Sequence, residues 1–173
     1  MFYIGRSIKE KQLFYLIVII AFAIIVRLIF GFFSLGSMSM GIASRAYQIS
    51  QGGSLDFQSL YSFRFALLYP VALLFKIFGI NLFSLSFYPF FCSMATIVVV
   101  FFLGKILFNE YVGVIAAFLL SFYPLNVVAG TSLYPDGPMA FFMSLSILLY
   151  VIGENTTSRK KAILWYFFFQ DLC

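Results

Sequence analysis

The stretch LFYLIVIIAFAIIVRLIFGFF, residues 13–33, decides the fold class of this chain. It contains one charged residue, Arg27, and is long enough to cross the apolar core of a bilayer as a helix. Backbone amides inside lipid need partners within their own segment, so a helix is the structure we expect there. The apolar region is too long for a removable signal peptide, and we interpret it as an uncleaved membrane anchor.

The composition extends this conclusion to the whole chain. Of the 173 residues, 63% are hydrophobic and 10% are charged, and the mean hydropathy is +1.04. Soluble domains carry about a quarter charged residues. Six acids and eleven bases cannot cover the surface of a water-soluble body of this size. We therefore expect an all-α, multi-pass transmembrane helical bundle and exclude a soluble enzyme.

Several kinds of site and partner are disfavoured by the same composition. The net charge is +5, but the bases are dispersed or lie at helix ends, so we expect no nucleic-acid partner. Histidine, the commonest metal ligand, is absent. Cys92 and Cys173 lie far apart without a CxxC pairing, which argues against a disulfide or a zinc site.

Further apolar runs predict the remaining membrane segments. We expect four complete spans and one partial span, at residues 13–33, 83–107, 112–128, 139–152 and, in part, 162–173. Two shorter helices, at residues 40–51 and 63–78, are expected to lie in the membrane interface. Residues 1–173 would then form a single transmembrane domain. Because the chain ends inside an apolar run, we interpret it as the N-terminal part of a longer protein; alternatively, the last helix is a short half-span.

The segment 63–78 decides the topology. It is short for a span of about 20 residues, and it contains Arg64 and Lys76. If it crossed the membrane, the basic cluster Arg159–Lys161 would lie opposite the N-terminal bases, whereas an interfacial helix places both on one side. The positive-inside rule favours the second arrangement. We therefore predict a cytoplasmic N-terminus, a long outer loop from residue 34 to about 82, and a turn around Asp136 on the outer side.

Two arginines near the outer face could carry chemistry, and each has a structural alternative. Arg27 lies inside a span, where a charge often marks a site, although its side chain could instead extend to the lipid headgroups. Arg45 precedes Ala46 on a segment whose apolar spacing, with Ile42 and Ile49, predicts a short amphipathic helix ended by glycine. That helix could also do no more than lie on the membrane.

Arg64, Tyr69 and Asp136 form the second set of candidates. An arginine near a tyrosine at the membrane surface suits a lipid phosphate, and ordinary interface anchoring is the alternative. Asp136, in Tyr134-Pro-Asp-Gly-Pro138, opens an apolar run where a helix dipole favours a carboxylate, and simple capping would explain it too. Asp56 is the only acid in the long outer loop.

In their order along the chain, these features resemble the N-terminal part of membrane-embedded glycosyltransferases of the GT-C fold. The resemblance is in particular to the family of protein O-mannosyltransferases and lipid A aminoarabinose transferases. The matching pieces are Val26-Arg-Leu28, Ala46-x-x-Ile49-x-x-Gly52, Arg64 with Leu67-Leu-Tyr69, Phe75-Lys-Ile-Phe-Gly79, Leu103-Gly-Lys-Ile-Leu-Phe108, Ala116-Ala117 through Tyr123-Pro124, and Tyr134-Pro-Asp-Gly-Pro138. They cover nearly all of this chain and about the first third of a typical member.

The resemblance implies that a sugar passes from a polyprenyl-phosphate carrier to an acceptor on the outer side of the membrane. It implies that Arg64 binds the donor phosphate, and we group Tyr69, Arg27 and Arg45 with it as phosphate-binding candidates. Asp136 would line the site, where it would orient the acceptor or a divalent cation. Asp136 and Asp56 are the candidate catalytic acids.

One departure from the family keeps a second function open. The family places a catalytic acid shortly before the Ala-x-x-Ile-x-x-Gly helix, but the matching stretch, Ser37-Met-Ser-Met40, has no carboxylate, and Asp56 follows the helix. Transfer needs a base to take the proton of the acceptor. The alternative is a non-catalytic multi-pass protein that binds polyprenyl lipid or acts as an assembly partner. A transporter is a weaker third hypothesis, because intramembrane charge is sparse and no inverted repeat is visible.

Overall fold

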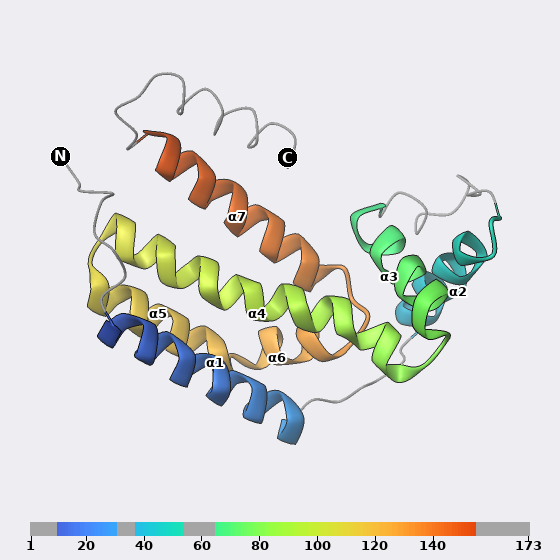
Figure 1. Cartoon of the computed structure of the whole chain (residues 1–173), viewed down its shortest axis with the longest axis horizontal. Coiled ribbons are helices and arrows are strands. Elements are labelled where there is room, and N and C mark those ends of the chain that lie inside the picture. The colour runs from blue at the N-terminus through green and yellow to red at the C-terminus, as the bar shows by residue number, and fades with distance from the viewer. Residues whose placement is uncertain (1–9, 31–36, 54–64, 155–173) are drawn as a thin grey trace. The chain divides into compact units, whose positions relative to one another are not determined.

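The computed structural model describes residues 10–30, 37–53 and 65–154, and its regular structure is helical throughout (Figure 1). The seven helices of these residues are α1 (Glu10–Phe30), α2 (Ser37–Ser50), α3 (Phe65–Phe78), α4 (Leu82–Leu107), α5 (Glu110–Phe122), α6 (Pro124–Thr131) and α7 (Asp136–Glu154). The described residues contain no strand, which confirms the predicted all-α class. Asp56, Arg64, the cluster Arg159–Lys161 and the expected partial span 162–173 lie outside the described residues.

Three of these helices are long and apolar enough to cross a bilayer. They are α1, α4 and α7, with 21, 26 and 19 residues, and a span needs about 20 residues. Large apolar side chains of α1 are exposed, among them Phe14 at 64% and Leu28 at 72%. In water such a surface would be unstable, whereas lipid solvates it. The chain is therefore a helical integral membrane protein.

The expected span at residues 112–128 is divided between two helices. Helices α5 and α6 are bent by 61° at a short break between them. The break falls at Tyr123, whose backbone leaves the helical region (φ −59°, ψ 120°). Pro124 follows directly, and the ring of a proline pushes the preceding residue out of the helical conformation. The pair forms either one broken span or a re-entrant loop, so the crossing at 112–128 stays a prediction.

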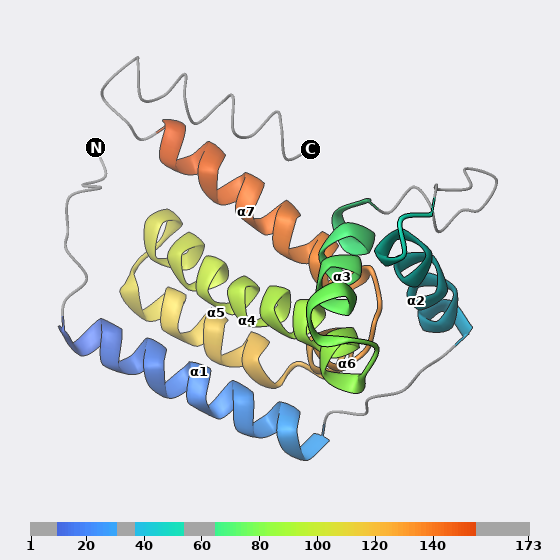
Figure 2. The same ribbon diagram turned by 45° about the vertical axis from the view of Figure 1, so that its right-hand side comes forward.

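Helices α2 and α3 occupy the two stretches that we expect to lie in the membrane interface. They lie side by side (Figure 1 and Figure 2). The chain leaves α2 through Gly52, which adopts a φ of 79°, and the N–H of Gly52 bonds to the carbonyl of Ile49 at 3.0 Å. Glycine adopts such a φ without strain, which suits it to the position just after a helix. The depth of both helices in the membrane stays a prediction.

The described part of the chain divides into two compact units. Among the described residues, one unit comprises 10–26, 94–123 and 139–154. Its core contains Leu16, Ile19 and Ala23 of α1, Ile97 and Phe101 of α4, and Ala117 of α5. Gly104 of α4 and Gly113 of α5 come into backbone contact, because a Cβ on Gly104 would lie 2.7 Å from the Cα of Gly113. Small residues allow this close approach of helices in membranes.

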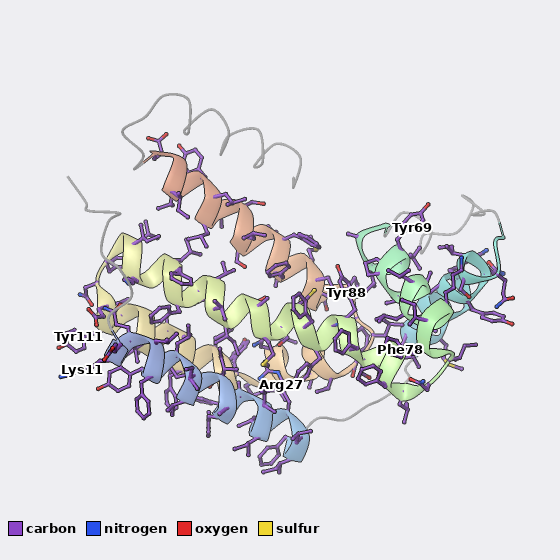
Figure 3. All side chains as sticks on the ribbon, in the orientation of Figure 1. Lys11, Arg27, Tyr69, Phe78, Tyr88 and Tyr111 are labelled. Atoms are coloured by element: carbon purple, nitrogen blue, oxygen red, sulfur yellow. The ribbon has the colours of Figure 1, made fainter. Side chains whose placement is uncertain are left out.

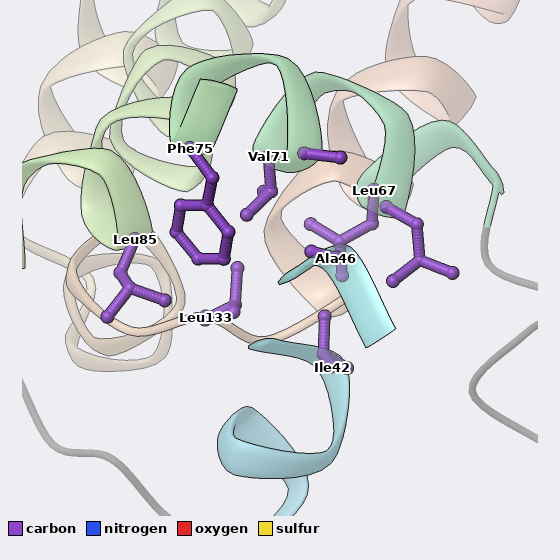
Figure 4. Packing of buried hydrophobic residues seen from close by; sticks show 9 residues of the cluster. Ile42, Ala46, Leu67, Val71, Phe75, Leu85 and Leu133 are labelled. Atoms are coloured by element: carbon purple, nitrogen blue, oxygen red, sulfur yellow. The ribbon is translucent and has the colours of Figure 1, made fainter. Parts of the chain in front are cut away.

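The other unit comprises, among the described residues, 27–30, 37–53, 65–93 and 124–138. Its core is built from Ile42 and Ala46 of α2, Leu67, Leu68, Val71, Ala72 and Phe75 of α3, Leu85 of α4, and Leu133. The side chains of Phe75, Leu85 and Leu133 point toward one another (Figure 4). Leu133 precedes α7 by three residues, so the turn that leads into α7 is anchored on the pair α2–α3.

We expect Gly104→Ala and Gly113→Ala each to lower the free energy of unfolding by about 1–3 kcal/mol. A Cβ on Gly113 would lie 2.6 Å from the carbonyl oxygen of Phe101, so the helices must move apart to admit it. Thermal unfolding in detergent measures the change. Ile115→Ala, on a 57% exposed position of α5, is the control with little expected effect. Unchanged stability in both glycine variants would show that the two helices are not in contact at these positions.

Candidate functional site

A buried arginine joins the parts of three helices that belong to the second unit. Arg27 lies in the last turn of α1 and is 1% exposed (Figure 3). Its Nη2 donates a hydrogen bond to Oγ of Ser93 in α4 at 2.7 Å. The Ser93 hydroxyl in turn donates toward Asn126 of α6, whose Oδ1 and backbone O lie 3.1 and 3.2 Å away. The guanidinium therefore connects α1 to α4 directly and to α6 through Ser93.

Gly130 of α6 leaves the space that this network fills. A Cβ at Gly130 would lie 2.6 Å from both Cβ and Oγ of Ser93 and 3.3 Å from Nε of Arg27. A larger residue would displace the hydroxyl that accepts the arginine's hydrogen bond. A buried charge in a membrane protein is tolerated where polar groups surround it, and this network supplies such groups.

The burial of Arg27 separates its two interpretations. A side chain that is 1% exposed does not extend to lipid headgroups in this structure. Contact with a donor phosphate would require the phosphate to reach a guanidinium that the surrounding helices enclose. The phosphate-binding role of Arg27 therefore stays a prediction, while its role in joining helices follows from the hydrogen bonds.

Arg45 and Tyr69 lie on the helix pair α2–α3, away from the buried core. Nη1 of Arg45 donates to Oε1 of Gln48, one turn further along α2, at 3.0 Å. Tyr69 is 53% exposed and projects from α3 (Figure 3). Both side chains are accessible to a ligand at the surface of the unit, as a phosphate-binding role requires.

Asp136 is the exposed first residue of α7. The preceding turn is held by a hydrogen bond from the N–H of Tyr134 to the carbonyl of Ser132 at 2.8 Å. Gly137 packs closely on α6, since a Cβ there would lie 3.0 Å from the carbonyl oxygen of Ala129. The carboxylate thus stands at a helix N-terminus on a firmly packed turn, where it can stabilise the helix dipole and also meet a ligand.

Metal ligands do not gather in the described residues. No group of three or more His, Cys, Asp or Glu side chains is found in the ranges 10–30, 37–53 and 65–154. A divalent cation at Asp136 stays a prediction.

The stretch that stands where the family has an acid forms the first turn of α2. Within it, Ser39 is fully buried, and its Oγ has no hydrogen-bond partner in the described part of the chain. Ser39 continues the buried face of Ile42 and Ala46 at helical spacing. This turn therefore contributes a packing face, and Ser39 offers no carboxylate for catalysis.

The structure places the four described candidates, Arg27, Arg45, Tyr69 and Asp136, in the same compact unit. The sequence did not single out Ser93 or Asn126, because both are neutral side chains inside apolar runs. The one available signal was Arg27 itself, since a buried guanidinium needs oxygen acceptors. The sequence could not tell which helices would supply them.

Comparison with known proteins gives one match. A family model described as dolichyl-phosphate-mannose-protein mannosyltransferase matches residues 65–169, which is more than half of the 173 residues. The matched range begins at the first residue of α3 and includes α4, α5, α6 and α7. The comparisons with curated proteins and with solved structures gave no match.

We expect Ser93→Ala to lower the free energy of unfolding by about 1–3 kcal/mol, because the buried guanidinium loses an acceptor. Arg27→Met keeps the length of the side chain and removes the charge. If the two residues act together, the double variant should lose less stability than the sum of the single variants. Thermal or denaturant unfolding of all four proteins measures this difference. Strictly additive losses would show that the hydrogen bond at 2.7 Å contributes nothing to stability.

Proposed function

This chain belongs to the dolichyl-phosphate-mannose-protein mannosyltransferase family, and from that membership we propose that it binds a polyprenyl-phosphate-linked sugar and takes part in transferring the sugar to an acceptor on the outer side of the membrane. The description of the family names dolichyl-phosphate mannose as the donor and protein as the acceptor. Mannose is therefore the first sugar to test with this chain.

The packing of Leu133 is the observation that supports a shared site. Leu133 belongs to the same core as Leu67 and Leu68 of α3. Asp136 follows Leu133 by three residues, and Arg64 precedes Leu67 by three. The acid-bearing turn and the helix that follows Arg64 are thus parts of one compact unit. We propose that Arg64 and Asp136 face the same aqueous compartment, on the side opposite a cytoplasmic N-terminus.

The proposed chemistry is a displacement at the anomeric carbon of the sugar. The hydroxyl oxygen of the acceptor attacks this carbon from the side opposite the phosphate, and the bond from the carbon to the phosphate oxygen breaks. The electron pair leaves with the lipid phosphate, and the acceptor's proton passes to a carboxylate. The stereochemistry at the anomeric carbon is inverted.

Five of the candidate residues have a proposed role in this step. The guanidinium of Arg64, with the hydroxyl of Tyr69, would offset the charge that grows on the leaving phosphate. Arg45 would add a second cation to the donor site. Asp136 would accept the acceptor's proton or orient the acceptor, as general-base catalysis requires. Asp56 is the other carboxylate we propose for that role.

A second candidate function is supported by the first turn of α2. The buried residue of this turn is Ser39, which has no carboxylate. A chain without a base could still hold the donor lipid through its cations. The alternative is therefore a membrane protein that binds polyprenyl lipid without transferring the sugar, or that assists the assembly of a transferase.

We expect Arg64→Ala to weaken the binding of polyprenyl-phosphate mannose by about 10–100-fold, as expected for a lost hydrogen bond to a charged group. Arg64→Lys keeps the charge without the bidentate geometry and should lose less. Lys76→Ala removes an exposed cation from the last turn of α3 and is the matched control. The measurement is binding and transfer of radiolabelled donor by the whole chain in nanodiscs.

The outcome separates the two functions. Transfer that is lost in Asp136→Asn while donor binding persists supports the enzyme. Binding without transfer by the unchanged chain supports the lipid-binding alternative. A chain that binds no donor contradicts both.

Sidedness is tested with single cysteines introduced as Arg64→Cys and Asp136→Cys in a chain carrying Cys92→Ser and Cys173→Ser. A membrane-impermeant maleimide should label both from outside intact cells, because we place both residues in the outer compartment. Tyr111→Cys, at an 80% exposed position that we predict to be cytoplasmic, should react only after permeabilisation. Labelling of positions 64 and 136 from opposite sides would remove the proposed site.

A further inference from the structure

Helix α3 carries a proline in its interior, Pro70. A proline has no N–H group, so the carbonyl of Ala66, four residues earlier, cannot receive its usual helical hydrogen bond. This carbonyl can therefore accept a hydrogen bond from a donor elsewhere in the chain.

The hydroxyl of Tyr88 in α4 supplies that donor. Its Oη donates to the carbonyl oxygen of Ala66 at 2.7 Å, which is a short and favourable distance for an O–H···O bond. The ring of Tyr88 packs against the core of α2 and α3, and Figure 3 marks Tyr88 on α4. One turn further along α4, the buried Cys92 lies on the same face of the helix as Tyr88. The hydroxyl is thus held in place beside the proline-interrupted turn.

The opposite end of α3 is fixed to α4 by short-range contacts. Gly79 ends α3 with a φ of 75°. Oδ1 of Asn81 accepts from the N–H of Ser84 at 2.7 Å, while its Nδ2 donates to the carbonyl of Phe78 at 2.9 Å. The hydroxyl of Ser84 donates to the carbonyl of Gly79 at 2.8 Å. Since α3 and α4 are connected here, the bond from Tyr88 fixes the other, N-terminal end of α3.

We infer that Tyr88 is a positioning residue, which sets the first turn of α3 against α4 by completing the hydrogen bond that Pro70 removes. Arg64 directly precedes this helix, and Tyr69 lies one turn inside it. The inference rests on the proposed function in one respect, because this turn matters for the donor only if those two residues bind its phosphate. Tyr88 acts on the donor only through the backbone of α3.

The test is a double-mutant cycle of Tyr88→Phe and Pro70→Ala in the whole chain in nanodiscs. Tyr88→Phe removes the hydroxyl and keeps the ring. Pro70→Ala restores an N–H that can bond to Ala66 within the helix. Tyr111→Phe, at an 80% exposed position, is the matched control for loss of a tyrosine hydroxyl. Circular dichroism and gel filtration check that each variant is folded.

The first readout is amide hydrogen exchange in the first turns of α3. We expect Tyr88→Phe to speed exchange there by about 3–10-fold, the size expected from one lost hydrogen bond. In a chain that already carries Pro70→Ala, the same substitution should have no effect, because the helix then provides its own donor. Equal acceleration with either residue at position 70, or acceleration with neither, overturns the inference.

The second readout is the binding and transfer of polyprenyl-phosphate mannose. Tyr88→Phe should raise the donor KM, or the donor Kd if there is no transfer, by about 3–10-fold. The kcat at saturating donor should stay unchanged, and Pro70→Ala should restore the affinity. In one outcome, Tyr88→Phe changes the exchange as expected but leaves the donor affinity unchanged, while Arg64→Ala still weakens binding. The inference that Tyr88 positions the donor site is then wrong, and the proposed function stands. If the unchanged chain binds no donor, the proposed function and the donor-positioning step fail together, and the exchange cycle still decides whether Tyr88 holds the turn.

Discussion

Hydrogen bonding of the backbone inside lipid is the constraint on which the rest of this structure depends. Every N–H and C=O group at membrane depth needs a partner in the protein, and each proline removes one donor. Two prolines of this chain show what can follow when a helical donor is missing. At Pro124 the helix stops, and α5 and α6 separate at an angle of 61°. At Pro70 the helix continues, and Tyr88 of α4 provides the missing donor to Ala66. The first solution bends a membrane segment, and the second attaches one helix to another.

The same constraint governs the buried charge. Arg27 is almost completely enclosed, and its guanidinium is engaged with Ser93, which also contacts Asn126. Gly130 leaves room for this contact. The polar groups of the unit thus divide by position. Arg27 joins helices from within, whereas Arg45, Tyr69 and Asp136 stand at accessible positions on elements that the apolar core holds in place. This division favours the accessible residues as the ones that meet a ligand.

Helix α2 shows how packing limits the chemistry at one position. Its buried face runs from Ser39 through Ile42 and Ala46, and the last two contribute to the core with α3. A carboxylate in place of Ser39 would have to be buried, which is costly for a charged group without a partner. The proposed transfer therefore draws its base from Asp136 or Asp56, and the alternative of lipid binding without transfer requires no base. The proposed transfer and the lipid-binding alternative share the same donor site. They differ in whether a base takes the proton of the acceptor.

The lipid environment, the helical class and the family could all be predicted from the sequence. Apolar runs such as residues 13–33 require helices in lipid, and the spacing of Ile42, Ala46 and Ile49 predicted α2, because both patterns act within a few residues. The sequence also marked Arg27 and Asp136 as unusual, since charged residues are rare in such a chain. The surroundings of these residues depend on how the helices pack. Arg27 bonds to Ser93 across 66 positions of the chain, and Ser93 bonds to Asn126 across 33. Tyr88 bonds to Ala66 across 22 positions. Such partners are chosen by the packing of helices, which depends on the shapes of many side chains at once and leaves no local pattern in the sequence.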